Sequence, residues 1–250
     1  MTSLYDIPLY YISFNKNEEV ERYYNKIGFT DVNHFQAVNG KKFKPAKLLE
    51  DKVISFRCYR DLVKGRIEHC GMPTLGGIGC TMSHYTLWKH CVDNNLPYII
   101  ITEEDNIFKN DISKEDESNI LNAITDTNGI FIGVNIDRRY KIIEFTGTQF
   151  CVLSNDACKV LVNYCFPIDV QTDAYIAYLA SAGFLSLAGY GLTTQRSHKS
   201  YIQDVCVACN ISKYATDYNY VLLFIVMFFI LLFYITIHFI YKYKNCSKAM

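Results

Sequence analysis

The sequence lacks an excess of charge of either sign. Its 25 basic side chains are matched by 25 acidic ones, and no long run of Lys or Arg occurs. Proteins that hold nucleic acid through its phosphates present a basic patch or stripe. The composition therefore predicts that nucleic acid is not a partner.

The sequence also lacks a second close pair of cysteines. Of its ten cysteines, only Cys206 and Cys209 have the C-x-x-C spacing, and His198 is the one histidine near them. A structural zinc site takes four ligands, so this pair alone does not predict one. Scattered cysteines in apolar stretches are typical of small buried thiols in a reducing compartment.

A secretory signal is not recognisable at the N-terminus. Residues 1–14 carry Asp6 and Pro8 and have no basic start, whereas a signal peptide begins with positive charge and continues with an apolar run. Residues 7–14 are better explained as a first β-strand. We therefore expect the main domain to stay in the cytosol.

The chain has one long apolar segment, near its C-terminus. Residues 221–240 are twenty residues without a formal charge, enough for a helix to cross a hydrocarbon core of about 30 Å. Tyr218, Tyr220 and Tyr241 flank this segment as aromatic residues do at membrane surfaces. The alternative, a helix buried in a protein core, would normally show a polar face.

We expect four parts, in a single-pass membrane protein anchored at its C-terminus. They are a domain at 1–205, a linker at 206–220, a transmembrane helix at 221–241 and a short basic tail at 242–250. The lysines of the tail favour placing the tail in the cytosol. We give more weight to the missing signal peptide, because a folded domain needs a signal to start its export.

Within residues 1–205, strand-like and helix-like patterns alternate. Residues 97–102 are a run of strand length that is mostly apolar, typical of a central strand covered on both faces, and residues 130–135 and 149–153 are similar. Three polar residues are expected to cap helices: Ser83, Asn155 and Thr172. This alternation predicts an α/β sheet whose ligands bind beyond the carboxyl ends of its strands.

Three acidic residues follow the apolar run directly: Glu103, Glu104 and Asp105. Carboxylates at the end of a buried strand repel one another and lose hydration, and a cation relieves both costs. Oxygen ligands suit hard ions such as Mg²⁺ and Mn²⁺, which also bind diphosphate. An exposed acidic turn is the alternative that these residues alone leave open.

A series of motifs resembles glycosyltransferase family 25. The segment LGGIGCTMSHYTLW at residues 75–88 is similar to that family's G-x-I-G-C-x-x-S-H-x-x-x-W signature, and the acidic triplet follows as the family's E-D-D motif does. Further similar elements stand in the same order, namely ER at 21–22, FQAVNG at 35–40, GTQFCVLS at 147–154 and PID at 167–169. The resemblance covers residues 7–202.

The resemblance implies a GT-A-like, Rossmann-type nucleotide-sugar-binding domain. It implies inverting transfer of a hexose, galactose or glucose, from a nucleotide-sugar donor such as a UDP-hexose. The acceptor would be a hydroxyl of a glycan, a lipid-linked sugar or a protein, and a divalent ion, Mn²⁺ or Mg²⁺, would assist.

The same resemblance assigns expected roles to several residues. Asp105 and Glu103 are the expected metal ligands, and His198 is a further candidate. Glu104 and His84 join Glu103 and Asp105 in the expected donor-binding set; a hydrogen-bonded histidine near the start of a helix is the alternative for His84. Two residues are candidates for the base that takes the acceptor proton: Asp169 and Asp173. Asp169 is favoured, because it falls in the P-x-D motif.

Two residues depart from the family pattern. Glu104 stands where the family usually has Asp, and Gly77 stands where it often has Glu. These departures keep a second function open. In that alternative, the chain is an inactive relative that acts as a membrane-bound interaction or sugar-binding protein.

Overall fold

The structure is a computed structural model that describes residues 3–139, 142–196, 226–230 and 233. The chain divides into two compact units, Met1–Val205 and Cys206–Met250. In the second unit, residues 226–230 and 233 are helical and expose apolar side chains. No helix in the described ranges combines the length and apolar character needed to cross a membrane. The rest of the predicted span at 221–241 lies outside those ranges.

The first unit is built on a six-stranded sheet in the order β2-β1-β3-β8-β5-β9. Five of these strands run in one direction and β8 runs against them, since it pairs antiparallel with both β3 and β5. The strands are β1 (Leu9–Ser13), β2 (Val32–Gln36), β3 (Tyr98–Glu103), β5 (Gly129–Ile132), β8 (Phe150–Ser154) and β9 (Ser186–Gly189). The predicted α/β class is confirmed, as a mixed sheet rich in parallel strands, which fits a GT-A-like domain.

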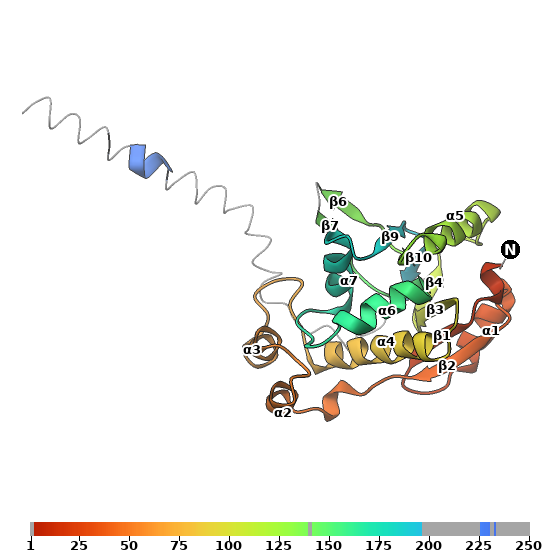
Figure 1. The fold of residues 1–250 in the computed structure, drawn as a ribbon, viewed down its shortest axis with the longest axis horizontal. Coiled ribbons are helices and arrows are strands. Elements are labelled where there is room, and N and C mark those ends of the chain that lie inside the picture. The colour runs from red at the N-terminus through yellow and green to blue at the C-terminus, as the bar shows by residue number, and fades with distance from the viewer. Residues whose placement is uncertain (1–2, 140–141, 197–225, 231–232, 234–250) are drawn as a thin grey trace, which may run out of the picture. The chain divides into compact units, whose positions relative to one another are not determined.

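Helices and short strands complete the unit (Figure 1). The helices are η1 (Leu4–Asp6), α1 (Glu18–Ile27), η2 (Gly40–Lys42), α2 (Pro45–Glu50), α3 (Phe56–Lys64), α4 (Leu75–Asp93), α5 (Lys114–Thr125), α6 (Asn155–Tyr164) and α7 (Thr172–Ser181). Two two-stranded sheets join β4 (Asn106–Phe108) to β10 (Thr193–Gln195) and β6 (Asp137–Arg139) to β7 (Ile142–Glu144).

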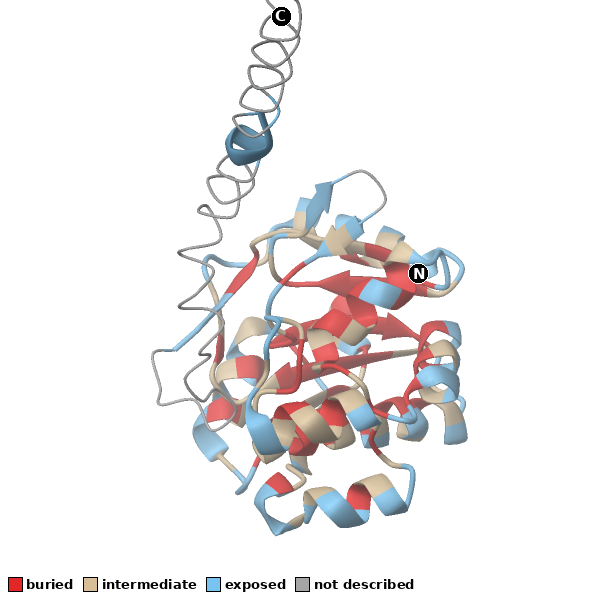
Figure 2. Ribbon diagram, turned by 90° about the vertical axis from the view of Figure 1, so that its left-hand side faces the viewer, coloured by how far each residue is buried: buried red, intermediate tan, exposed pale blue. Residues whose placement is uncertain are grey.

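Two apolar cores lie on opposite faces of the sheet, because successive strand side chains point to opposite sides. Ile99 and Ile101 of β3 pack with α4, α6 and α7 in one core, while Ile100 packs with α1 and α5 in the other. All three isoleucines are fully buried, and Figure 2 shows buried residues concentrated in the strands and the helix faces against them. The predicted central strand is therefore confirmed.

Helix α4 begins earlier than we expected. Thr74 caps it, because its hydroxyl accepts a hydrogen bond from the amide of Gly76 at 3.1 Å. Ser83 therefore lies inside the helix, and its prediction as a cap is wrong. Its hydroxyl donates to the carbonyl of Gly79 at 2.8 Å and accepts from the amide of Val38 at 2.9 Å.

The other two predicted caps are wrong by one residue. Ser154, not Asn155, caps α6, and its hydroxyl accepts from the amide of Ala157 at 3.1 Å. Gln171 precedes α7, so Thr172 is the first helical residue. Propensity alone does not separate neighbouring polar residues at a helix start, because several of them can accept the first free amides.

Two glycines, Gly40 and Gly79, allow helix α4 to pack directly against the backbone of residues 38–40. A Cβ on Gly40 would lie 1.7 Å from the carbonyl oxygen of Leu75. A Cβ on Gly79 would lie 2.4 Å from the carbonyl oxygen of Val38 and 2.7 Å from the amide nitrogen of Gly40. These contacts are to backbone, which cannot rotate away. They explain why a helix with several glycines is placed so closely against residues 38–40.

We predict that Gly79→Ala lowers the free energy of unfolding by about 1–3 kcal/mol, the usual cost of overpacking. Gly77→Ala is the matched control in the same helix, because its Cβ would meet the flexible end of Met72 at 2.7 Å rather than backbone. Both changes gain roughly 1 kcal/mol of helix propensity. Urea denaturation measures the difference, and equal stability of the two variants would contradict the backbone contact.

Candidate functional site

The acidic triplet lies at the carboxyl end of β3, where open α/β sheets bind ligands. Glu103 is half-buried, and one carboxylate oxygen accepts from the hydroxyl of Thr148 at 3.1 Å. Its other oxygen accepts from the side-chain amide of Gln195 at 3.4 Å. Thr148 reaches this edge because β8 is antiparallel, so the residues that precede β8 meet the end of β3.

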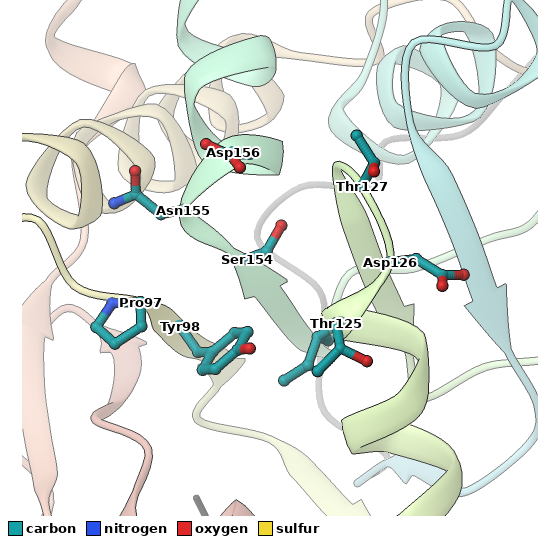
Figure 3. A pocket seen from close by; sticks show the side chains of 9 residues that line it. Pro97, Tyr98, Thr125, Asp126, Thr127, Ser154, Asn155 and Asp156 are labelled. Carbon is teal, nitrogen blue, oxygen red and sulfur yellow. The ribbon is translucent and has the colours of Figure 1, made fainter.

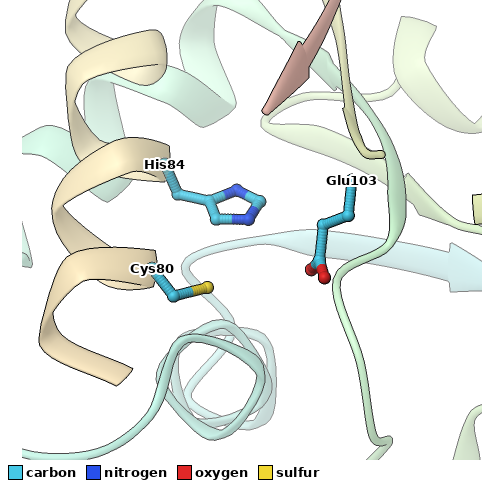
Figure 4. Close-up of side chains that lie close together, drawn as sticks. All are labelled: Cys80, His84 and Glu103. Carbon is cyan, nitrogen blue, oxygen red and sulfur yellow. The ribbon is translucent and has the colours of Figure 1, made fainter. Parts of the chain in front are cut away.

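Helix α4 directs two further side chains at Glu103 (Figure 4). Cys80 and His84 are four residues apart, which places them on one face of the helix. One potential ligand atom from each of Cys80, His84 and Glu103 lies within 4.8 Å of the other two. His84 is 1% exposed, and its Nε2 has no hydrogen-bond partner among the described residues.

Burial sets the protonation of these groups. Burial raises the pKa of Glu103 to about 7, and the nearby charges of Asp105 and Asp173 add to the rise. Burial also raises the pKa of the Cys80 thiol well above its usual range, with a further contribution from Glu103. Burial lowers the pKa of His84 to about 4, so this imidazole is neutral at physiological pH.

Asp105 and Glu104 continue the turn after β3. The carbonyl of Asp105 accepts from the amide of Arg196 at 2.8 Å, and the amide of Glu104 donates to the carbonyl of Ile12 at 3.2 Å. The pKa of Glu103 is raised by the charge of Asp105, so these two carboxylates disfavour each other's ionised form. A divalent cation would reverse this penalty, and the two residues therefore fit the ion that the sequence predicts.

The two candidate bases lie in different surroundings. Asp173, in the first turn of α7, accepts from the amide of Gly147 at 3.1 Å, and its charge raises the pKa of both Glu103 and Cys80. Its own pKa is raised by burial. The structure thus places Asp173 close to the acidic triplet.

Asp169 instead contacts the start of α3. It accepts hydrogen bonds from the hydroxyl of Ser55 and from the guanidinium of Arg57, the latter at 3.1 Å, and its side chain is 44% exposed. The base role stays a prediction, and the geometry favours Asp173 over Asp169 for it. His198, the further metal candidate, lies outside the described residues.

Three residues of this site were missed by sequence reasoning. The sequence could have indicated Cys80, because it stands four residues before His84 and so lies on the same face of a helix. Thr148 lies in a motif that was recognised, although nothing in the motif indicates contact with Glu103. Gln195 gave no signal, since only the pairing of β10 with β4 brings it to this edge.

A separate pocket lies at the opposite edge of the sheet. Its volume is about 360 Å³, and its lining includes Tyr98 at the start of β3, Ser154 at the end of β8 and Asp126 after α5 (Figure 3). All three residues lie where the parallel strands begin, and Ser154 is there because β8 runs antiparallel to them. The pocket therefore does not belong to the candidate site.

Comparison with known proteins shows the family of the chain. The sequence model described as "Glycosyltransferase family 25 (LPS biosynthesis protein)" matches residues 8–200. A "Glycosyltransferase 25 family member" from Drosophila melanogaster is 37% identical over 90 residues, which are 36% of this chain and 14% of that protein.

Two further relatives come from distant organisms. "Procollagen galactosyltransferase 2" from Homo sapiens is 31% identical over 85 residues, or 34% of this chain and 13% of that protein. "Lipooligosaccharide biosynthesis protein lex-1" from Haemophilus influenzae is 32% identical over 98 residues, or 36% of this chain and 32% of that protein. The chain thus spans less than a third of the length of these relatives.

Fold and site define an α/β domain, rich in parallel strands, with acidic side chains at the carboxyl end of its central strand. The family match covers most of that domain. The chain belongs to glycosyltransferase family 25.

Proposed function

We propose that this protein transfers a hexose, galactose or glucose, from a nucleotide-sugar donor such as a UDP-hexose. The acceptor is a hydroxyl of a glycan, a lipid-linked sugar or a protein. The observation that carries this proposal is the gathering of Glu103, Asp105 and Asp173 at one sheet edge in a chain of family 25. The names of the human and bacterial relatives support a hexose and an acceptor of these kinds.

Donor binding in this proposal rests on the end of β3. Glu103 and Asp105 would hold a divalent ion, Mn²⁺ or Mg²⁺, which when bound screens the charge of the nucleotide diphosphate. Thr148 and Gln195 orient Glu103 through the hydrogen bonds described above. Glu104, next to both carboxylates, adds negative charge to the same edge.

Proton removal rests on Asp173. A carboxylate with a raised pKa is a stronger base than an ordinary one, and burial raises the pKa of Asp173. Asp173 would take the proton of the acceptor hydroxyl while that oxygen attacks the sugar carbon and the diphosphate leaves. A single displacement of this kind inverts the configuration at the sugar carbon.

A membrane anchor is also part of the proposal. The twenty uncharged residues at 221–240 are long enough to span a bilayer of about 30 Å, and those of them that are described expose apolar side chains. The seven described cysteines of the first unit are free thiols, which suits a domain that faces the reducing cytosol.

The first test concerns the metal and the donor. We expect Asp105→Asn, which keeps size and removes charge, to weaken UDP binding in Mn²⁺ at least tenfold, a typical loss when a metal site is disturbed. Asp93→Asn, on the exposed end of α4, is the matched control. Titration calorimetry measures the UDP affinity of each protein in Mn²⁺ and again after a chelator has removed the ion. Unchanged Mn²⁺-dependent UDP binding in Asp105→Asn would remove this residue from the site.

The second test concerns the base. We expect Asp173→Asn to lower turnover by about 10²–10⁴-fold, the range for loss of a general base, with donor affinity near normal. Asp169→Asn should keep most turnover and lower thermal stability, because it weakens the contacts with Ser55 and Arg57. The reverse pattern would return the role to Asp169. Donor binding with no transfer in the parent chain would favour the inactive sugar-binding alternative.

The third test concerns the anchor. We expect the full chain to stay with membranes after an alkaline wash, and a chain with Phe229→Lys and Leu231→Lys to be released, because each central lysine costs about 2.5–3.5 kcal/mol on insertion. Protease added outside sealed membranes should digest residues 1–205. Protection of that domain, or a glycan on Asn210, would show the opposite orientation.

A further inference from the structure

We propose that Cys80, His84 and Glu103 form a binding site for a borderline transition-metal ion such as Zn²⁺, with one coordination position open. The inference rests on the proposed function, because it names a different ion for the same sheet edge than the hard ion expected from the acidic triplet. Of the acidic triplet it uses Glu103 alone, to which it adds the thiolate of Cys80 and the imidazole of His84.

The geometry is that of a nearly formed three-ligand site. One potential ligand atom of each of the three residues lies within 4.8 Å of the other two. Zinc lies about 2.0–2.3 Å from such atoms, so its ligand atoms stand roughly 3.3–3.8 Å apart. Small rotations of the side chains of Cys80 and Glu103, which are half-buried, would shorten the present distances between ligand atoms to those around zinc.

His84 gives a second and independent indication of a ligand. Its ring is 1% exposed, yet Nε2 has no hydrogen-bond partner among the described residues. A buried polar atom without a partner costs about 1–3 kcal/mol, so such an atom implies an unseen partner. Figure 4 shows the ring directed toward the space between α4 and Glu103. A metal ion there would satisfy Nε2.

The ligand types select the metal. Thiolate and imidazole favour zinc and related ions, whereas Mg²⁺ and Mn²⁺ prefer oxygen ligands. The site also has the outer contacts that metal ligands usually have. The hydroxyl of Thr172 points to the sulfur of Cys80 at 3.9 Å, and Thr148 and Gln195 hold Glu103.

The open position gives the site a role in the reaction. Three protein ligands are typical of catalytic zinc, which keeps its fourth position for water or substrate. Cys80 and Glu103 are half-buried, whereas His84 is buried. A diphosphate oxygen of the donor is the fourth ligand that fits the proposed function.

Cobalt is the probe for this site, because Co²⁺ takes the place of zinc and a thiolate bound to it gives a strong charge-transfer absorption. The full chain carries Cys206→Ser and Cys209→Ser in all samples, so that the C-x-x-C pair cannot bind the ion. We compare this chain with its Cys80→Ala and His84→Gln variants. Cys151→Ala is the matched control, since Cys151 is a buried cysteine of the same region whose thiol donates to the carbonyl of Thr148 at 3.4 Å.

The parent and Cys151→Ala should bind one Co²⁺ with the thiolate absorption and exchange it for Zn²⁺. Cys80→Ala should lose the absorption, and both site variants should bind Zn²⁺ at least about 10–100-fold more weakly, as even outer-shell changes do. Circular dichroism confirms folding, and Glu103→Gln replaces any variant that does not fold. Parent cobalt binding without thiolate absorption, or equal zinc affinity in Cys80→Ala and Cys151→Ala, would overturn the inference.

The metal measurement separates this inference from the proposed function, because it needs neither donor nor acceptor. Zinc binding that depends on Cys80 in a chain without transferase activity would support the site and reject the function. Transfer in Mn²⁺ that is unchanged in Cys80→Ala, together with no zinc binding, would reject the site and leave the function intact.

Discussion

The antiparallel pairing of β8 with β3 is the constraint on which the site depends. Because β8 runs against its neighbours, the residues that precede it arrive at the carboxyl end of β3. Thr148 then reaches Glu103, and the amide of Gly147 holds Asp173. A parallel strand in that place would carry these residues to the opposite edge, and Asp173 would lose its contact with the site.

The contact between helix α4 and the turn at residues 38–40 fixes the position of the helix that carries Cys80 and His84. Gly40 and Gly79 allow backbone to touch backbone, and Ser83 links the helix to Val38. The next residue, His84, is then directed at Glu103. The glycines and the serine of the family signature therefore have a packing role, while its cysteine and histidine face the site. Gly77 departs from the family within the same helix, where buried Met72 occupies the neighbouring space.

The site contains half-buried carboxylates that repel one another, and a bound cation can relieve this repulsion. Burial raises the pKa of Glu103, and the nearby charges of Asp105 and Asp173 add to the rise. His84 keeps a buried nitrogen without a partner among the described residues. Natural proteins accept such costs at functional sites, where a bound group can remove them, so these features support the proposed binding of a cation and a diphosphate at this end of β3.

The sequence by itself determined the fold class, the central strand and the acidic triplet at its end. These depend on local pattern, because a continuous apolar run needs cover on both faces and charges can only follow it at the edge. It also carried the family motifs from which activity was inferred. Helix starts were less determined, since Thr74 and Ser83 are both good capping residues, and the structure has Thr74 at the cap and Ser83 inside the helix.

Tertiary structure alone decided which acidic residue joins the triplet. Asp169 and Asp173 are four residues apart and equally polar, but Ser55 and Arg57 hold the first while the turn before β8 holds the second. Cys80 and His84 likewise lie near Glu103 only because α4 packs beside β3. Contacts between residues far apart in the sequence depend on strand direction and helix placement, and local pattern does not encode either of them.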